Sequence, residues 1–247
     1  MFPTEELQRT ENLSEQATNI KVEENYKMGP SRQPTIDELT QLAHETARKI
    51  EGYVSEDRQT WAKKKSNMII VHSRSSTEYS GKLFVAESII NFSPETVFEF
   101  VSTGSTRVKW DKAIKHIETL EQLDQDLFIQ KCLVGSQAGG AISSREFVDL
   151  VLIKRSTDSL SHTAVSIDYP ACPPSPKCIR GFNHPLGIIC SRIPSDPNKC
   201  RVTNIVQSDP CGKVPHGLID TVMPSIVSDF FPRLEKALNK AKSDQRI

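Results

Sequence analysis

The chain has 247 residues, 37% of them hydrophobic and 25% charged, which is enough for one domain with a sizeable core plus a tail. Its 31 basic and 31 acidic side chains give a formal net charge of zero, which argues against nucleic acid as the main partner because phosphate binding needs a basic surplus. Six cysteines without a CxxC pair, no apolar stretch near the roughly 20 residues that span a bilayer, and no apolar signal-peptide core predict a cytoplasmic protein with free thiols.

The first residues of the chain are polar and show no sustained hydrophobic period, so we interpret residues 1–33 as a disordered tail. A capping box follows, with Thr35 as the N-cap and Glu38 as the third helical residue. Apolar residues then recur at helical spacing. This pattern predicts a helix from about Thr35 to Tyr53 that buries one face.

Two strands separated by a polar turn are expected next, at residues 68–74 and 82–90. Ser93 and Pro94 then stand in the order of a helix cap and a first helical position, and they predict a short helix.

From about residue 114 to residue 207 the chain is a succession of short strand-like segments with turn signals between them. We expect strands at 127–134, 146–155, 160–167, 178–182, 188–192 and 201–208. Strands that follow one another without intervening helices predict an antiparallel sheet.

The last predicted element is a long helix with Pro215 at its first position. Its apolar face is wider than most surface helices need. Pro224 and Pro232 lie inside the helix, and each removes a backbone donor, which predicts a kink or a looser segment. A curved sheet that closes around this helix would bury the wide face, so the fold class is α+β with room for a cavity between sheet and helix.

Motifs of catalytic and metal-binding sites are absent from the sequence, which contains no GxSxG, P-loop, GxGxxG, HExxH or EF-hand pattern. The six histidines are scattered without metal-ligand spacing, and nothing distinguishes carboxylates such as Asp149 and Asp168 from structural ones. We therefore expect no metal, no cofactor and no enzymatic activity.

Four segments resemble, in the right order, motifs of START (steroidogenic acute regulatory protein-related lipid transfer) domains. They are 107–111 (RVKWD), 143–155 (SSREFVDLVLIKR), 179–187 (IRGFNHPLG) and 209–215 (DPCGKVP). The resemblance covers about Thr35 to Leu238, and it is greatest to the short, single-domain sterol- and bile-acid-binding group, members four to six and especially five. We accordingly assign residues 34–241 to a START domain and 242–247 to a C-terminal tail.

This resemblance implies a helix-grip fold, in which a curved antiparallel sheet grips the C-terminal helix around an internal cavity. It also implies non-enzymatic lipid binding and transfer, with one sterol or sterol-like ligand in the cavity. The partners that we expect are this lipid and, transiently, a membrane surface, and we expect the protein to act as a monomer.

The cavity positions of the family fall on Asp111, Cys132, Val151 and Ser161. Some sterol-binding members have an acid in place of Cys132 and an arginine in place of Val151, which form a buried ion pair. This chain has neither, so we expect a less charged cavity in which Asp111 and Ser161 are candidate anchors for a ligand hydroxyl. The remaining predicted wall residues are Val134, Val222, Met223, Ile226, Val227 and Phe230.

The segment from Val134 to Ile142, VGSQAGGAI, resembles the Ω-loop that lies beside the helix in this family. Its glycines allow backbone freedom, so we expect the loop and the helix to move together and admit lipid. The predicted gate residues are Gly135, Ser136, Gln137, Ala138, Gly139 and Gly140.

Other functions fit the same pattern. A lipid-responsive interaction module would bind lipid without moving it between vesicles and would present an altered surface to a protein partner. An enzyme with the same fold would need converging acid and base groups, and the sequence offers only Asp111 in the cavity. Bile acids, carotenoids and fatty acyl chains remain open as ligands, because apolar walls discriminate poorly between similar shapes.

Overall fold

The computed structural model describes residues 33–66 and 68–244. Nearly all of the predicted N-terminal tail therefore lies outside the described residues. The first element is helix α2 (Ile36–Ser55), and its capping box is confirmed: the backbone N–H of Glu38 donates to Thr35 Oγ1 (3.3 Å), and the backbone N–H of Thr35 donates to Glu38 Oε2 (2.8 Å).

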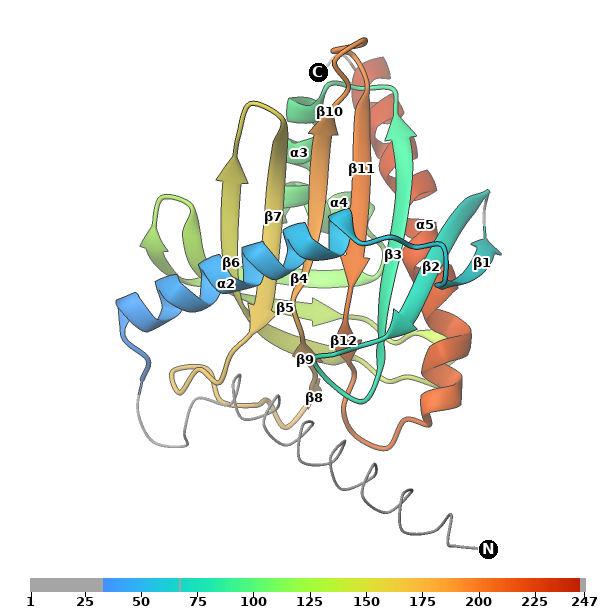
Figure 1. The fold of residues 1–247 in the computed structure, drawn as a ribbon. Helices are drawn as coiled ribbons and strands as arrows, with labels where there is room; N and C mark the ends of the chain where they lie inside the picture. Colours follow the sequence, from blue (N-terminus) through green and yellow to red (C-terminus); the bar gives the residue numbers. More distant parts are fainter. Residues whose placement is uncertain (1–32, 67, 245–247) are drawn as a thin grey trace, which may run out of the picture.

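A large curved sheet forms the body of the protein (Figure 1). Its strands pair in the order β1-β2-β3-β11-β10-β7-β6-β5-β4, and every pairing along this path is antiparallel, as predicted. The bounds are β1 (Ala62–Ser66), β2 (Ile69–Ser75), β3 (Lys82–Ile90), β4 (Ile114–Asp124), β5 (Leu127–Val134), β6 (Arg145–Arg155), β7 (Ser159–Ser166), β10 (Leu186–Arg192) and β11 (Cys200–Val206).

Three short strands complete the sheet structure of the described residues: β8 (Ile179–Arg180), β9 (Phe182–Asn183) and β12 (Ser208–Asp209). Strand β8 pairs with the start of β6 in parallel, and β9 pairs with β12. The single strand predicted at 178–182 is therefore wrong in detail, because the chain changes partners at Gly181, where a side chain would collide with the Phe147 ring.

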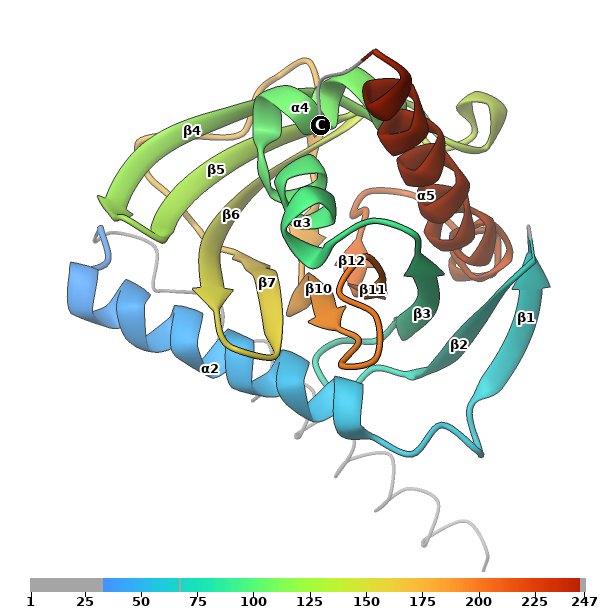
Figure 2. The same cartoon turned by 90° about the horizontal axis from the view of Figure 1, so that it is seen from above.

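Three helices lie on the concave side of the sheet, whereas α2 crosses the convex side (Figure 2). They are α3 (Pro94–Ser102), α4 (Gly104–Trp110) and α5 (His216–Ser243). Helix α3 begins as predicted, because the backbone N–H of Thr96 donates to Ser93 Oγ (3.3 Å) and Pro94 follows the cap. Helix α4 was not predicted: it has only seven residues, none of them buried, and no side-chain cap marks its start.

Helix α5 runs without interruption through both of its prolines. Pro215 is the N-cap residue and not the first helical residue, so the predicted start is wrong by one position. The helix reaches Ser243 and thus extends into the segment predicted as a C-terminal tail. With a curved antiparallel sheet around a long C-terminal helix, the predicted α+β helix-grip architecture is confirmed.

Candidate functional site

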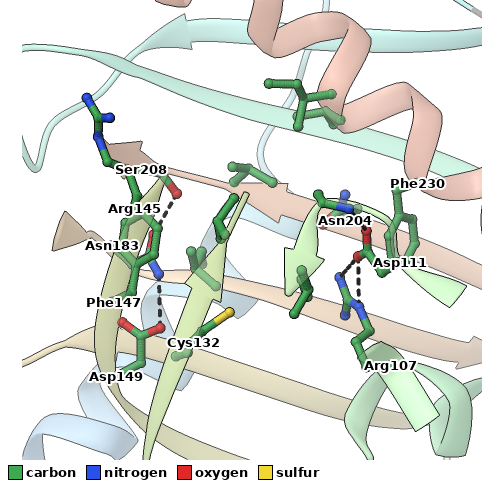
Figure 3. A pocket seen from close by; sticks show the side chains of 18 of the residues that line it. Arg107, Asp111, Cys132, Arg145, Phe147, Asp149, Asn183, Asn204, Ser208 and Phe230 are labelled. Carbon is green, nitrogen blue, oxygen red and sulfur yellow. Dashed lines mark hydrogen bonds and ion pairs between the residues drawn. The ribbon is translucent and has the colours of Figure 1, made fainter. Parts of the chain in front are cut away.

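A cavity of about 290 Å³ lies between the concave face of the sheet and helices α3, α4 and α5. This volume is near the lower end of the roughly 300–1,000 Å³ that is typical of small-molecule pockets. Figure 3 shows side chains from the strands and helices converging on it. Its lining is mostly apolar, with contributions from Val101, Ile117, Phe147, Leu186, Ile188, Ile219, Met223, Ile226, Val227 and Phe230.

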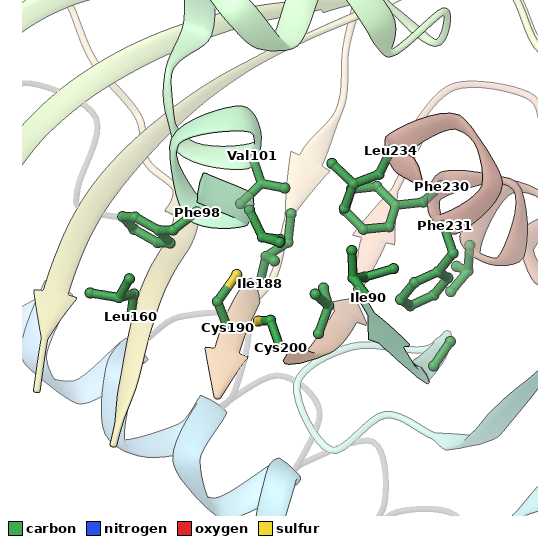
Figure 4. Packing of buried hydrophobic residues seen from close by; sticks show 14 of the residues in the cluster. Ile90, Phe98, Val101, Leu160, Ile188, Cys190, Cys200, Phe230, Phe231 and Leu234 are labelled. Atoms are coloured by element: carbon green, nitrogen blue, oxygen red, sulfur yellow. The ribbon is translucent and has the colours of Figure 1, made fainter. Parts of the chain in front are cut away.

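A core of buried hydrophobic residues lies next to the cavity. This cluster joins α3, the sheet and α5 through buried residues such as Phe98, Ile90 and Phe231 (Figure 4). Phe230 and Val227 belong both to this cluster and to the cavity wall. Helix α5 therefore holds its position by burial along the core while it presents one side to the cavity.

Arg107 of α4 and Asp111, the residue that ends this helix, form an ion pair in the cavity wall. Arg107 Nε and Nη2 lie 3.0 and 2.9 Å from Asp111 Oδ2. The other carboxylate oxygen accepts the backbone N–H of Ala113 (3.2 Å). The guanidinium also lies over the rings of Trp110 and Phe230, at 5.2 and 5.1 Å from their centroids. Asp111 is therefore already compensated in charge and hydrogen bonding.

A second polar group in the wall is built around Asp149 of β6, which is buried. Ser166 Oγ donates to its Oδ1 (2.6 Å) and Asn183 Nδ2 donates to its Oδ2 (2.9 Å). Asn183 Oδ1 in turn accepts from Ser208 Oγ (2.6 Å), as Figure 3 shows. Burial nevertheless dominates and raises the pKa of Asp149 to about 6, although both hydrogen bonds act to lower it.

Two further groups in the cavity wall are kept uncharged by their surroundings. Burial lowers the pKa of His162 to about 4, and the nearby Arg107 charge adds to this shift. Burial raises the pKa of the Cys132 thiol to about 12. The imidazole is therefore neutral and the thiol protonated at neutral pH, which leaves the wall without an activated cysteine nucleophile.

Arg145 ties together two segments at one end of the cavity. Its Nε donates to the carbonyl of Pro210 (2.6 Å) and its Nη2 to the carbonyl of Cys211 (3.2 Å), both in the link that leads into α5. Its Nη1 donates to the carbonyl and hydroxyl oxygens of Ser143, at the end of the β5–β6 loop (both 2.6 Å). The loop and the start of α5 are thus connected through one buried side chain.

The β5–β6 loop is closed on itself by hydrogen bonds between Gln137 and Ile142, with N–O distances of 2.8 and 3.2 Å. At its tip Gly140 has a φ of 99°, a region that only glycine adopts readily, whereas Ala138 has a left-handed φ of 51°. The tip is exposed, but Gly135, Gln137 and Ile142 line the cavity.

Most of the predicted wall residues line the cavity: Asp111, Cys132, Val134, Met223, Ile226, Val227 and Phe230. Of the predicted gate residues, Gly135 and Gln137 do so as well, whereas Ser136, Ala138, Gly139 and Gly140 are exposed in the loop and do not line it. Val151 faces the same side of β6 as Asp149 but is buried in the adjacent core. Val222 is half-buried on α5 outside the lining.

Ser161 was wrongly predicted as a cavity residue. Successive side chains of a strand point to opposite faces, and His162 and Ala164 of β7 line the cavity. Ser161 therefore points to the convex face, toward the side covered by α2. The hydroxyl anchor proposed at this position is excluded.

Several polar residues of the wall were not predicted from the sequence, namely Arg107, Gln130, Asp149, His162, Asn183 and Asn204. A signal existed for Asp149, because a carboxylate inside the apolar run of β6 has to be buried or face a polar site. For Gln130, His162, Asn183 and Asn204, the sequence does not say which face of the strand turns inward. Arg107 lies on α4, a helix that the sequence does not predict.

Within residues 33–66 and 68–244, no helix combines the length and apolar character needed to cross a bilayer. In the same part of the chain, no three His, Cys, Asp or Glu side chains gather in a way that could hold a metal ion.

Comparisons with known proteins agree with this architecture. Residues 41–244 match the START domain family. StAR-related lipid transfer protein 5 of Bos taurus is 34% identical over 204 residues, which cover 81% of this chain and 95% of the relative. StAR-related lipid transfer protein 6 of Homo sapiens is 33% identical over 207 residues, which cover 83% of this chain and 94% of the relative.

The solved structure of human StAR-related lipid transfer protein 5 superimposes on this chain with a TM-score of 0.79 at 32% identity. The superposition covers 83% of this chain and 99% of the human chain. Since the family match and these relatives extend over most of the described residues, the chain belongs to the START domain family.

Proposed function

We propose that this protein binds one sterol-like lipid in the cavity beneath α5 and carries it between membranes, without making or breaking a bond. The observation that carries the proposal is the mostly apolar cavity between sheet and helix, with room for a single small ligand. The names of the relatives support it, since both are lipid transfer proteins.

The hydrophobic effect supplies the driving force for binding. Burying about 400 Å² of apolar ligand surface yields on the order of 10 kcal/mol at ~25 cal/mol per Å². Association entropy takes back several kcal/mol or more, which leaves room for a micromolar or tighter affinity. The protonated Cys132 thiol and the neutral His162 ring keep this part of the wall uncharged, in accord with a lipid ligand.

Lipid enters, in this proposal, between the β5–β6 loop and α5. Both elements contribute to the same cavity, through Gln137 and Ile142 of the loop and Ile219 and Met223 of the helix. The exposed loop tip has few contacts to lose, whereas the rest of α5 is anchored in the core. Movement of the loop together with the first turns of α5 opens the cavity at the smallest cost in burial.

Native mass spectrometry of the purified protein, before and after incubation with cholesterol-containing vesicles, tests the proposal. We expect a one-to-one adduct of sterol mass, and transfer of labelled sterol from donor to acceptor vesicles. Binding without transfer would replace the carrier by a lipid-responsive interaction module. If no lipid of any class is retained or taken up, lipid binding itself is refuted.

A further inference from the structure

The charged and amide groups of the cavity wall differ in whether their hydrogen-bonding capacity is already used. Asp111 is engaged by Arg107 and by the backbone of Ala113. Asp149 and Asn183 are engaged by each other and by serine hydroxyls. The hydrogen-bonding atoms of these groups are already used within the protein, so they contribute little to the recognition of a ligand.

Asn204 of β11 is different. It is only 7% exposed and lines the cavity, yet its carboxamide has no hydrogen-bond partner among the residues that the structure describes. Its neighbours across the sheet are Ala86 on β3 and Ile188 on β10, neither of which has a polar side chain. Figure 3 shows the Asn204 side chain reaching into the cavity.

A buried polar group without a partner is costly, and native proteins keep such groups mainly where a function uses them. The inward-facing positions of β11 also include Cys200 and Val202, both in the hydrophobic core. A leucine or valine at position 204 would continue this apolar row. The polar residue at this position is therefore best explained by a polar group on the ligand.

We propose that Asn204 is the residue that recognises the polar end of the bound lipid, and that this end is an uncharged hydroxyl or carbonyl group. This inference rests on the proposed function and specifies its ligand. A carboxamide has two donors and one acceptor, so it can both donate to and accept from a hydroxyl, which has the same dual capacity.

The charges around the cavity favour an uncharged group over a carboxylate. Arg107 is neutralised by Asp111 and Arg233 by Asp229. Arg145 already directs its donors to oxygens of the loop and of the link before α5. An anionic ligand would therefore meet the Asp111 carboxylate without an available cation, so lipids that carry a carboxylate bind less well than neutral sterols.

The test compares two ligands with one skeleton: cholesterol, which carries a 3-hydroxyl, and cholestane, which lacks it. We expect the wild-type protein to bind cholesterol about tenfold more tightly, because a buried hydrogen bond is formed only with the hydroxyl. In Asn204→Leu, the two dissociation constants should become nearly equal. Asn204→Thr keeps a hydroxyl on a residue that suits a strand, and should retain part of the preference.

Ser161→Ala, on the opposite face of the sheet, is the matched control and should leave the preference unchanged. The proposal is overturned if Asn204→Leu keeps the preference for cholesterol, or if it weakens both ligands equally. It is also overturned if a bile acid carboxylate binds the wild type more tightly than cholesterol, an outcome that leaves lipid binding intact. If the wild type binds none of these ligands, the proposed function itself is refuted, and not only the role of Asn204.

Discussion

The two faces of the sheet are built from the same strands but have different chemistry, and β6 shows this most clearly. On the convex face, Val148, Leu150 and Leu152 pack with apolar residues of α2 into one hydrophobic cluster. On the concave face, Phe147 and Asp149 line a cavity that also contains an ion pair and a neutral histidine. Both faces are buried, so burial alone does not locate the site.

The difference lies in what each face does with polar groups. Along α2, small residues such as Ala43 and Ala47 let the helix approach the sheet and fill the space. The concave face instead retains a carboxylate whose pKa is raised by burial, and an amide without a partner. Such groups lower stability and are kept mainly where a function uses them, which supports the proposal of a binding site on the concave face.

The largest effect that separates the two faces should come from Leu150→Ala. Leu150 is 1% exposed in the convex cluster, so its truncation leaves a cavity that the neighbouring strands cannot close. We expect the free energy of unfolding to fall by about 2–5 kcal/mol. Met223→Ala, half-buried and facing the existing cavity, should cost about 1 kcal/mol or less. Urea unfolding of both variants measures the contrast, and equal losses would refute it.

The pH dependence of stability should carry a signature of Asp149. Its pKa is raised from 3.8 to about 6 in the folded protein, so the folded state holds more protons than the unfolded state between about pH 4 and pH 6. The contribution of Asp149 to the free energy of unfolding is therefore present below pH 4 and is lost as the pH rises through 6. A difference of about two pKa units corresponds to about 3 kcal/mol.

Histidines act in the opposite direction over nearly the same range. The folded-state pKa values of His162 and His184 are lowered to about 4, so their contributions are present above pH 6.5 and are lost as the pH falls toward 4. The comparison of wild type with Asp149→Asn cancels these contributions. We expect the variant to gain about 3 kcal/mol relative to wild type between pH 4 and pH 7 in urea unfolding. A pH-independent difference would contradict the assignment.

The sequence predicts elements whose signals are local. The capping box of α2 and the strands Lys82–Ile90 and Leu127–Val134 have the predicted positions, because caps and turns act between residues close in the chain. Helix α4 escaped prediction because its seven residues carry neither a cap nor an apolar period. Its position depends on contacts with distant parts of the chain, such as the ring of Phe230.

The site was predicted less completely than the fold for a related reason. Strand β7 alternates Ser161, His162 and Thr163, all polar or small, so its sequence does not indicate which face turns toward the helix. The register with β6 and β10 decides that His162 faces the cavity and Ser161 does not. Asn204 could be recognised only once its apolar neighbours on two other strands were known.

After the Leu150 and Asp149 variants, the next largest effect on the free energy of unfolding should come from breaking the Arg107–Asp111 ion pair. Asp111→Ala leaves the guanidinium in the cavity wall without a counter-ion, at 16% exposure of its side chain. We expect a loss of about 2–3 kcal/mol in the free energy of unfolding, less than for a fully buried pair. The double variant Asp111→Ala, Arg107→Leu should recover part of this loss, since it removes the unpaired charge as well. The single variant Arg107→Leu completes the cycle: if the loss in the double variant equals the sum of the two single losses, the two charges are not coupled.

The smallest effect that we predict lies at the start of α2 and tests whether the convex face serves stability alone. Thr35→Ala removes the side-chain acceptor for the backbone N–H of Glu38, and should lower the free energy of unfolding by about 1 kcal/mol. Thr40→Ala, on the same helix, removes a hydroxyl that only donates to the carbonyl of Ile36, and should cost nothing because alanine favours the helix. Cholesterol affinity, measured well below the unfolding temperature, should be unchanged in both variants. A loss of affinity in Thr35→Ala would mean that α2 and the cavity are coupled through the sheet, so that the two faces are not independent.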